Sequence, residues 1–254
     1  MSFQEILIAC LAAFAAGFID AVVGGGGLVQ TPALLITFPQ YPVATLLGTV
    51  KIPSFCGTAV SAWQYSKKIN LNWALVGRIA LAAFFAALGG SYLVSMLSNA
   101  VVKPVIFIIL IGVAVYSYTK KSLGTHSFQV DARLALIRGV SAGLVIGFYD
   151  GFIGPGTGSF LVLVFISLLG FNFMEASAHA KVVNLATNLA SILYFGYTGH
   201  ILFQLALPMA ICNMAGGWGG TKLALKKGNR FIRVFFLAVV AATLLRFGWD
   251  IFLK

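Results

Sequence analysis

The chain has 254 residues, of which 60% are hydrophobic and 9% are charged, and its mean hydropathy is +0.97. A soluble protein of this length cannot bury so much apolar surface, so the composition indicates an all-α polytopic membrane protein. The net charge of +11 comes from short basic clusters between long apolar runs, which is typical of membrane loops and argues against nucleic acid as a partner.

The N-terminal apolar run follows no basic segment, and we interpret it as a first membrane span rather than a cleaved signal peptide. Three cysteines, Cys10, Cys56 and Cys212, lie in apolar runs without CxxC spacing. We therefore expect buried thiols, with no metal site and no disulfide framework. The chain also carries no ATP-binding motif, and we expect no cofactor.

Apolar runs predict five helical pieces in each half of the chain. In chain order they cover residues 4–23, 27–38, 42–66, 70–97 and 100–119, then 134–153, 157–170, 173–197, 200–222 and 230–252. A full span takes roughly 20 residues. The second piece of each half is too short for that, so we expect a half-helix or a steeply inclined segment there.

The two halves are copies of one unit. The string "GFIDAVVGGGG" begins at residue 17 and "GFYDGFIGPGTG" begins at residue 147, an offset of 147 − 17 = 130. The same offset pairs Asp20 with Asp150 and Lys51 with Lys181, which a shared apolar composition would not produce. The sequence therefore predicts a first repeat at 1–119, a linker at 120–133 and a second repeat at 134–254.

The basic residues change sides between the copies. Lys67 and Lys68 have uncharged counterparts in the second copy, and Lys226 and Lys227 have uncharged counterparts in the first, although one other basic pair is matched. Under the positive-inside rule, two such copies insert in opposite orientations, as in inverted-repeat transporters. We expect a cytoplasmic linker and cytoplasmic loops near 67–70 and 223–230, with both termini periplasmic.

Each glycine-rich string interrupts an apolar run directly after an aspartate. Irregular backbone is tolerated at membrane depth only where it is buried in protein or lines a wet cavity. A short helix follows each string, and a helix N-terminus favours an anion. One interpretation is that two such N-termini face one central anion site; the other is that the glycines only permit close helix packing. The candidate anion-binding residues here are Gly25, Gly26, Gly27, Gly156, Thr157, Gly158 and Ser159.

Lys51 and Lys181 lie within the third pieces of the two copies, where a lysine costs ~2.5–3.5 kcal/mol on insertion scales. Small polar side chains follow each lysine at helical spacing. They are Asn184 and Asn188 after Lys181, and Ser54 and Thr58 after Lys51. This pattern predicts an oxyanion site repeated twice, with Lys181 as the stronger anchor. The alternative is that each lysine merely neutralises an aspartate.

Three further titratable residues lie in predicted spans. Asp20 and Asp150 either stabilise the breaks or carry a coupling proton, and His179 is either a proton carrier or a packed, satisfied histidine. Thr49 and Gln30 are additional polar candidates for the site.

The strings "GFIDAVVGGGGL", "GTVKIPSFCGT", "GFYDGFIGPGTGSF" and "AKVVNLATNLASILYF" resemble the paired signatures of the TauE/SafE sulfite exporter family, also called the toluene sulfonate uptake permeases. The resemblance covers nearly the whole chain. It implies a bacterial inner-membrane transporter of small sulfur-containing anions, such as sulfite or sulfoacetate. By position, Lys51, Lys181 and the glycines match the motif residues of that family.

The predicted function is therefore transport, with export as the expected direction, by alternating access around a central site. An anion channel is the first alternative, and an intramembrane enzyme using Asp20 and Asp150 as a dyad is the second. We expect the partners to be the small anion, membrane lipid and a coupling proton or other ion. The sequence leaves the oligomeric state open, with a homodimer among the options.

Overall fold

The computed structural model describes residues 1–98 and 129–252, and every regular element in that part of the chain is an α-helix. The predicted all-helical class is thus confirmed. The first half contains α1 (Phe3–Val23), α2 (Gly27–Thr37), α3 (Val43–Ser66) and α4 (Trp73–Met96). The second half contains α6 (Ala132–Phe152), α7 (Thr157–Ser167), α8 (Phe173–Tyr197) and α9 (Phe203–Phe252).

Several helix boundaries differ from the predicted ones. The pieces expected at 200–222 and 230–252 are both part of α9, which bends at Gly228 (φ 74°, ψ −169°). The basic segment before this glycine continues the helix because lysine is a good helix former. α6 begins two residues earlier than expected, inside the predicted linker. The piece expected at 100–119 and most of the linker lie outside the described residues.

Polar side chains mark the starts of four long helices. Ser2, Asn72, Asp131 and Asn172 each accept a hydrogen bond from a backbone N–H in the first turn of α1, α4, α6 and α8. At Asn172 the Glu175 side chain also accepts from the capping residue's own N–H, completing a capping box. These caps satisfy N–H groups that have no partner within the helix.

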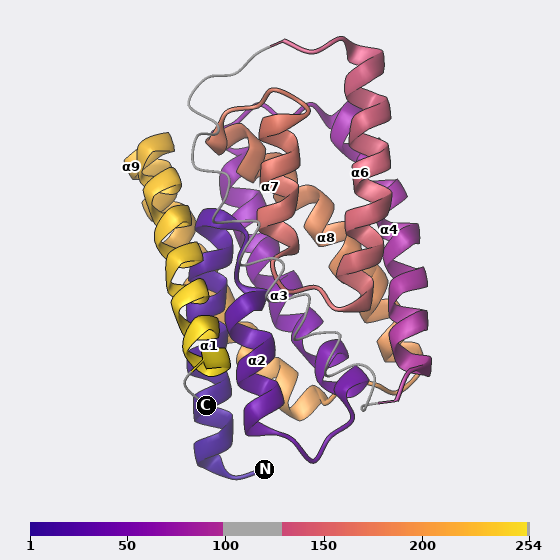
Figure 1. Ribbon diagram of the computed structural model, residues 1–254, viewed down its shortest axis with the longest axis vertical. Helices are drawn as coiled ribbons and strands as arrows, with labels where there is room; N and C mark the ends of the chain where they lie inside the picture. The colour runs from indigo at the N-terminus through magenta and orange to yellow at the C-terminus, as the bar shows by residue number, and fades with distance from the viewer. Residues whose placement is uncertain (99–128, 253–254) are drawn as a thin grey trace.

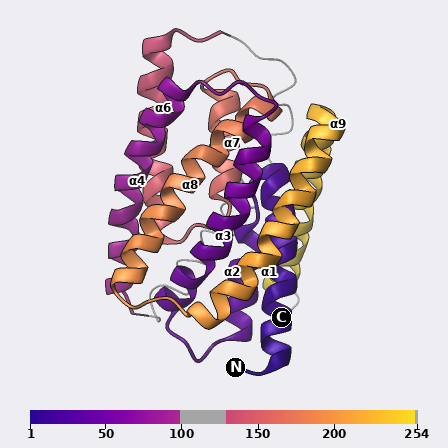
Figure 2. The same cartoon turned by 180° about the vertical axis from the view of Figure 1, so that it is seen from behind.

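Helices of the first half pack mainly against helices of the second half. α1 packs along α9 on one flank, α4 packs along α6 on the other, and α3 and α8 lie between them (Figures 1 and 2). α2, α3 and α4 begin 130 residues before α7, α8 and α9 respectively (157 − 27, 173 − 43, 203 − 73). α1 and α6 start at opposite ends of the molecule (Figure 1). Among the described helices, α7, α8 and α9 thus follow α2, α3 and α4 at one constant offset, and α6 runs in the direction opposite to α1.

Four of the helices, α1, α3, α4 and α6, are long and apolar enough to cross a membrane. α2 and α7 have 11 residues each, too few for a full span. Large apolar side chains also lie on the outside of the helices, as at Leu11, Leu81, Phe85, Val145 and Ile211. A soluble protein would hide this much apolar surface, whereas lipid accommodates it. The chain is a multi-pass membrane protein.

The described basic side chains, apart from the two interior lysines, gather at one end. They lie on the α3–α4 connection, in the first two turns of α4 and α6, and in the part of α9 before its bend, all at the end where α6 begins (Figure 1). These residues are Lys67, Lys68, Arg78, Arg133, Arg138, Lys222, Lys226 and Lys227. α1 begins and α9 ends at the opposite end.

Candidate functional site

Two interruptions of the helical backbone lie in the middle of the molecule. α1 ends at Val23 and is capped by Gly24, whose φ of 80° is left-handed and whose N–H donates to the Asp20 carbonyl at 2.8 Å. α6 ends at Phe152, and Gly154 and Gly156 reach α7 with φ values of 89° and 84°. L-amino acids with side chains rarely adopt this conformation, so the breaks need glycine at these positions.

The two breaks touch each other. The Ser159 N–H donates to the Gly24 carbonyl at 2.9 Å, and the Ser159 hydroxyl donates to the Val23 carbonyl at 3.0 Å. A Cβ on Gly24 would lie 2.6 Å from the carbonyl oxygen of Gly158. Close packing therefore accounts for Gly24 and Gly158, as the packing interpretation expects. Ser159 holds the two breaks together and does not line the cavity beside them.

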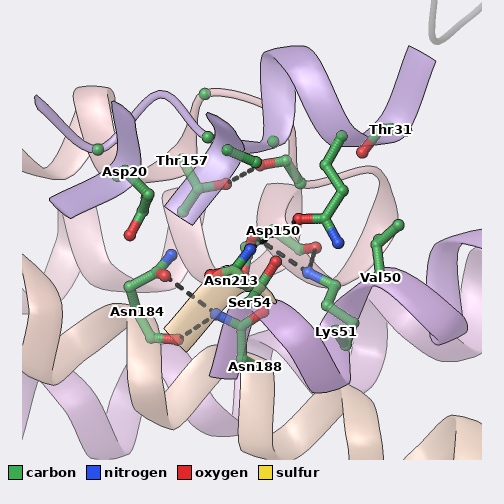
Figure 3. A pocket seen from close by; sticks show the side chains of 18 of the residues that line it. Asp20, Thr31, Val50, Lys51, Ser54, Asp150, Thr157, Asn184, Asn188 and Asn213 are labelled. Atoms are coloured by element: carbon green, nitrogen blue, oxygen red, sulfur yellow. Dashed lines mark hydrogen bonds and ion pairs between the residues drawn. The ribbon is translucent and has the colours of Figure 1, made fainter. Parts of the chain in front are cut away.

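A cavity of about 40 Å³ lies between the breaks and α3, α8 and α9 (Figure 3). A single water needs roughly 10–15 Å³, so the cavity has room for a small group of atoms. Gly26 and Gly27 at the start of α2, and Gly156, Thr157 and Gly158 at the start of α7, all line it. The other polar lining residues are Asp20, Gln30, Thr31, Lys51, Ser54, Asp150, Asn184, Asn188 and Asn213. Both short helices therefore begin at one shared cavity.

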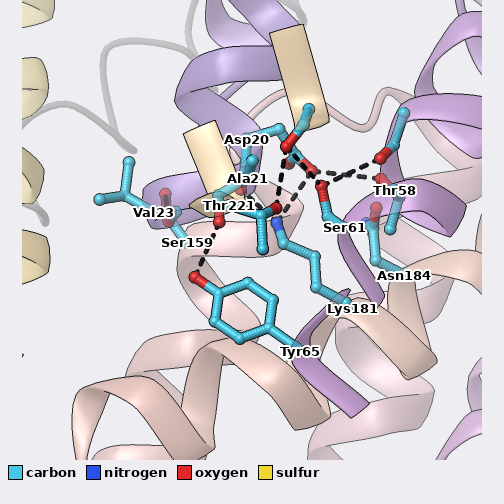
Figure 4. Close-up of polar contacts among 12 residues, drawn as sticks. Asp20, Ala21, Val23, Thr58, Ser61, Tyr65, Ser159, Lys181, Asn184 and Thr221 are labelled. Carbon is cyan, nitrogen blue, oxygen red and sulfur yellow. Dashed lines mark hydrogen bonds and ion pairs between the residues drawn. The ribbon is translucent and has the colours of Figure 1, made fainter. Parts of the chain in front are cut away.

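Each interior lysine pairs with the aspartate of the other half. Lys51 Nζ lies 3.1 Å from Asp150 Oδ1 and donates to the Asp150 carbonyl at 2.6 Å (Figure 3). Lys181 Nζ lies 2.8 Å from Asp20 Oδ2 and donates to the Asp20 carbonyl (Figure 4). Both ammonium groups thus sit near the C-terminal ends of α1 and α6, where the helix dipole favours a cation.

The two ion pairs differ in their access to the cavity. Lys51 and Asp150 both line it, whereas Lys181 does not, although its partner Asp20 does. Asn184 and Asn188 line the cavity together with Ser54, and Asn188 Nδ2 donates to Asn184 Oδ1 at 3.0 Å (Figure 3). The polar stripe predicted to serve Lys181 thus faces the cavity that Lys51 lines. The structure does not support Lys181 as the stronger anchor, because its long side chain is directed to the end of α1 instead.

Thr58 and Gly25 do not line the cavity. The Thr58 hydroxyl donates to Asp20 Oδ2 at 3.2 Å and so supports the Lys181–Asp20 pair (Figure 4). On the same side, the Tyr65 hydroxyl donates to the carbonyl of Ala21, in the last turn of α1. These contacts hold the end of α1 in place.

His179 lies away from the cavity and is engaged on both ring nitrogens. Its Nε2 accepts from the Asn72 N–H at 3.0 Å, so Nδ1 donates to the Glu175 carbonyl at 2.8 Å. Its ring stacks on Phe171, with centroids 4.3 Å apart. His179 therefore ties α8 to the connection before α4, which is the packed, satisfied arrangement.

Sequence reasoning did not identify Asn213 of α9, which lines the cavity and donates to Gln30 Oε1 at 3.0 Å. Comparing the two copies could not reveal it, because its counterpart at 213 − 130 is Ala83. The one feature of the sequence that could have indicated Asn213 is that it is a polar carboxamide within an otherwise apolar run.

A family model described as "Sulfite exporter TauE/SafE" matches residues 9–247, which is nearly the whole chain. The chain belongs to the TauE/SafE sulfite exporter family. The lysine motifs and both glycine-rich breaks fall inside the matched region. No solved structure matches the chain.

Curated relatives of this TauE/SafE chain are named as probable membrane transporter proteins. One from Haemophilus influenzae is 36% identical over 221 residues, covering 87% of this chain and 85% of the relative. One from Sinorhizobium sp., ORF9, is 31% identical, covering 97% and 93%. YfcA from Escherichia coli K12 is 33% identical, covering 92% and 87%. The protein is accordingly a membrane transporter and not an intramembrane enzyme.

Proposed function

We propose that this transporter moves small sulfur-containing oxyanions, such as sulfite or sulfoacetate, and that export is its net direction. The observation that carries the proposal is that Lys51 and the starts of both short helices, α2 and α7, line one shared cavity. The sulfite exporter description of the family model supports this choice of substrate.

The chemistry of the cavity suits an oxyanion. An anion in a low-dielectric interior needs positive charge, and helix N-termini supply only partial charges. Lys51 brings the ammonium group of a buried ion pair to the cavity: it is 3% exposed, lines the cavity and lies 3.1 Å from Asp150 Oδ1. Ser54 and Asn184 add side-chain groups that can donate hydrogen bonds. A bound oxyanion would compete with the Asp150 carboxylate for the Lys51 ammonium.

The arrangement of the halves supports alternating access. α1 and α6 run in opposite directions (Figure 1), and residues of both halves line the cavity. Inverted-repeat transporters place their substrate sites in this position, between discontinuous helices. We propose that a proton or another ion couples transport, with Asp20 and Asp150 as the candidate carriers because both line the cavity.

The direct test is transport by the purified protein in proteoliposomes. We expect saturable uptake of sulfite or sulfoacetate that responds to an imposed ion gradient. A channel would instead give a conductance that does not saturate in this range and that follows the anion gradient alone. If neither anion crosses faster than in protein-free vesicles, the proposed substrate class is wrong.

We propose that the end bearing the basic residues faces the cytoplasm, since basic loops are retained on that side. In a variant with the three native cysteines replaced, Lys68→Cys and Lys227→Cys should both resist an impermeant thiol reagent added to intact cells. Ser2→Cys, at the opposite end, should react. Labelling of positions 68 and 227 from opposite sides of the membrane would contradict the inverted-repeat arrangement.

A further inference from the structure

Gln30 presents an unpartnered donor at the cavity. It lies in the first turns of α2, is 1% exposed and lines the cavity. Its Oε1 accepts a hydrogen bond from Asn213 Nδ2 at 3.0 Å, but among the described residues its Nε2 has no partner. Buried amide groups without partners are rare because they lose the hydrogen bonds that water would give them. Such a group at a cavity points to a ligand.

Asn213 is itself held by packing. A Cβ on Gly17 of α1 would lie 2.8 Å from Asn213 Oδ1, and a Cβ on Gly57 of α3 would lie 2.9 Å from Asn213 Cγ. Two glycines on neighbouring helices therefore make the space in which the Asn213 side chain fits. Since Asn213 donates to Gln30 Oε1, this packing also fixes which end of the Gln30 amide remains available to the cavity.

The donor exists in only one half of the molecule. The positions equivalent to Gln30 and Asn213 in the other half are Phe160 (30 + 130) and Ala83 (213 − 130). Lys51, the lysine that lines the cavity, belongs to the same half as Gln30. The cavity is thus lined by one amide donor without a partner and by one lysine, both from the first half of the chain.

We propose that Gln30 determines the specificity of this site for oxyanions, by donating from Nε2 to one oxygen of an anion held at Lys51. The inference rests on the proposed anion-binding function and deepens it. An oxyanion presents separate oxygen atoms that accept from the lysine and the amide at once. A halide of equal charge has one atom for both donors, so it gains less from the amide.

The test is calorimetric titration of the purified protein with sulfite, sulfoacetate and chloride. Gln30→Glu keeps the Oε1 that accepts from Asn213 and replaces the Nε2 donor by a carboxylate oxygen. Because the new carboxylate repels every anion, the expected result is a loss of sulfite affinity at least tenfold greater than the loss of chloride affinity. Gln64→Glu is the matched control, because Gln64 is a half-buried glutamine of α3 whose Nε2 donates to the Trp218 carbonyl at 3.3 Å and which does not line the cavity. This variant should bind sulfite as the parent does.

A second variant separates specificity from folding. Gln30→Met with Asn213→Leu removes both hydrogen-bonding partners, which leaves no stranded polar group and should preserve the melting temperature. We expect its sulfite affinity to fall at least tenfold relative to its chloride affinity. The inference is wrong if the variants that fold keep the sulfite affinity and the sulfite-to-chloride affinity ratio of the parent. It is also wrong if neither Gln30 variant folds while Gln64→Glu does, because Gln30 then has a structural role. A parent protein that binds neither sulfite nor sulfoacetate would overturn the proposed function itself.

Discussion

Lys51→Gln combined with Asp150→Asn is expected to weaken sulfite binding by more than tenfold, which corresponds to above ~1.4 kcal/mol. The matching change in the other half, Lys181→Gln with Asp20→Asn, should have a clearly smaller effect. The reason is that Lys51 lines the cavity, whereas Lys181 does not. The measurement is calorimetric titration of both double variants with sulfite and sulfoacetate.

Double variants are needed because the ion pairs are buried. Removing one partner alone would strand a buried charge, which typically costs ~3–5 kcal/mol and would confuse binding with folding. If the Lys181 variant loses sulfite binding and the Lys51 variant keeps it, Lys181 is the stronger anchor, as the sequence predicted, and the anion does not bind at Lys51. If both variants bind sulfite as the parent does, the lysines are structural counter-ions and only the N-termini of α2 and α7 bind the anion.

Gly24→Ala is expected to prevent recovery of folded protein or to lower its melting temperature by many degrees. Its Cβ would lie 2.6 Å from the Gly158 carbonyl oxygen, and its φ of 80° strains any residue with a side chain. Backbone atoms cannot move aside at the crossing of the two breaks as a flexible side chain could. The measurement is thermal unfolding in detergent, together with the yield of monodisperse protein.

Gly25→Ala is the matched control for Gly24→Ala. The nearest atom to its Cβ would be Ser159 Oγ at 3.4 Å, which is ordinary contact, and its φ is not left-handed. This variant should fold with a melting temperature close to that of the parent. Equal tolerance of alanine at both positions would show that the breaks do not cross as closely as described.

The sequence allowed the all-helical class and the two breaks to be predicted. Hydropathy predicted the apolar helices, four of which are long enough to cross a membrane among the described residues, and the break positions followed from glycine strings in apolar runs. The offset of 130 residues also separates the first residues of α2, α3 and α4 from those of α7, α8 and α9. These features are local or periodic in the sequence, so no three-dimensional information was needed to find them.

What the sequence could not predict depends on contacts between distant segments. Helical spacing placed Asn184 and Asn188 on one face but could not show that this face meets the cavity beside Lys51. The side chain of Lys181 is long enough to reach more than one partner, and only the packing of α8 near α1 settles its choice of Asp20. Asn213 was missed because its role depends on α2, which lies 183 residues away in sequence.

The exchange of ion-pair partners between the halves also constrains how the protein is made. Lys51 precedes Asp150 by 99 residues, and Asp20 precedes Lys181 by 161 residues. At roughly 5–20 residues per second, a ribosome takes about 5 to 30 s to supply the missing partners. Throughout that interval the newly inserted first half holds an aspartate and a lysine whose final partners do not yet exist. Until the second half is inserted, Asp20 and Lys51 must therefore be hydrated, pair with each other or be held by the insertion machinery.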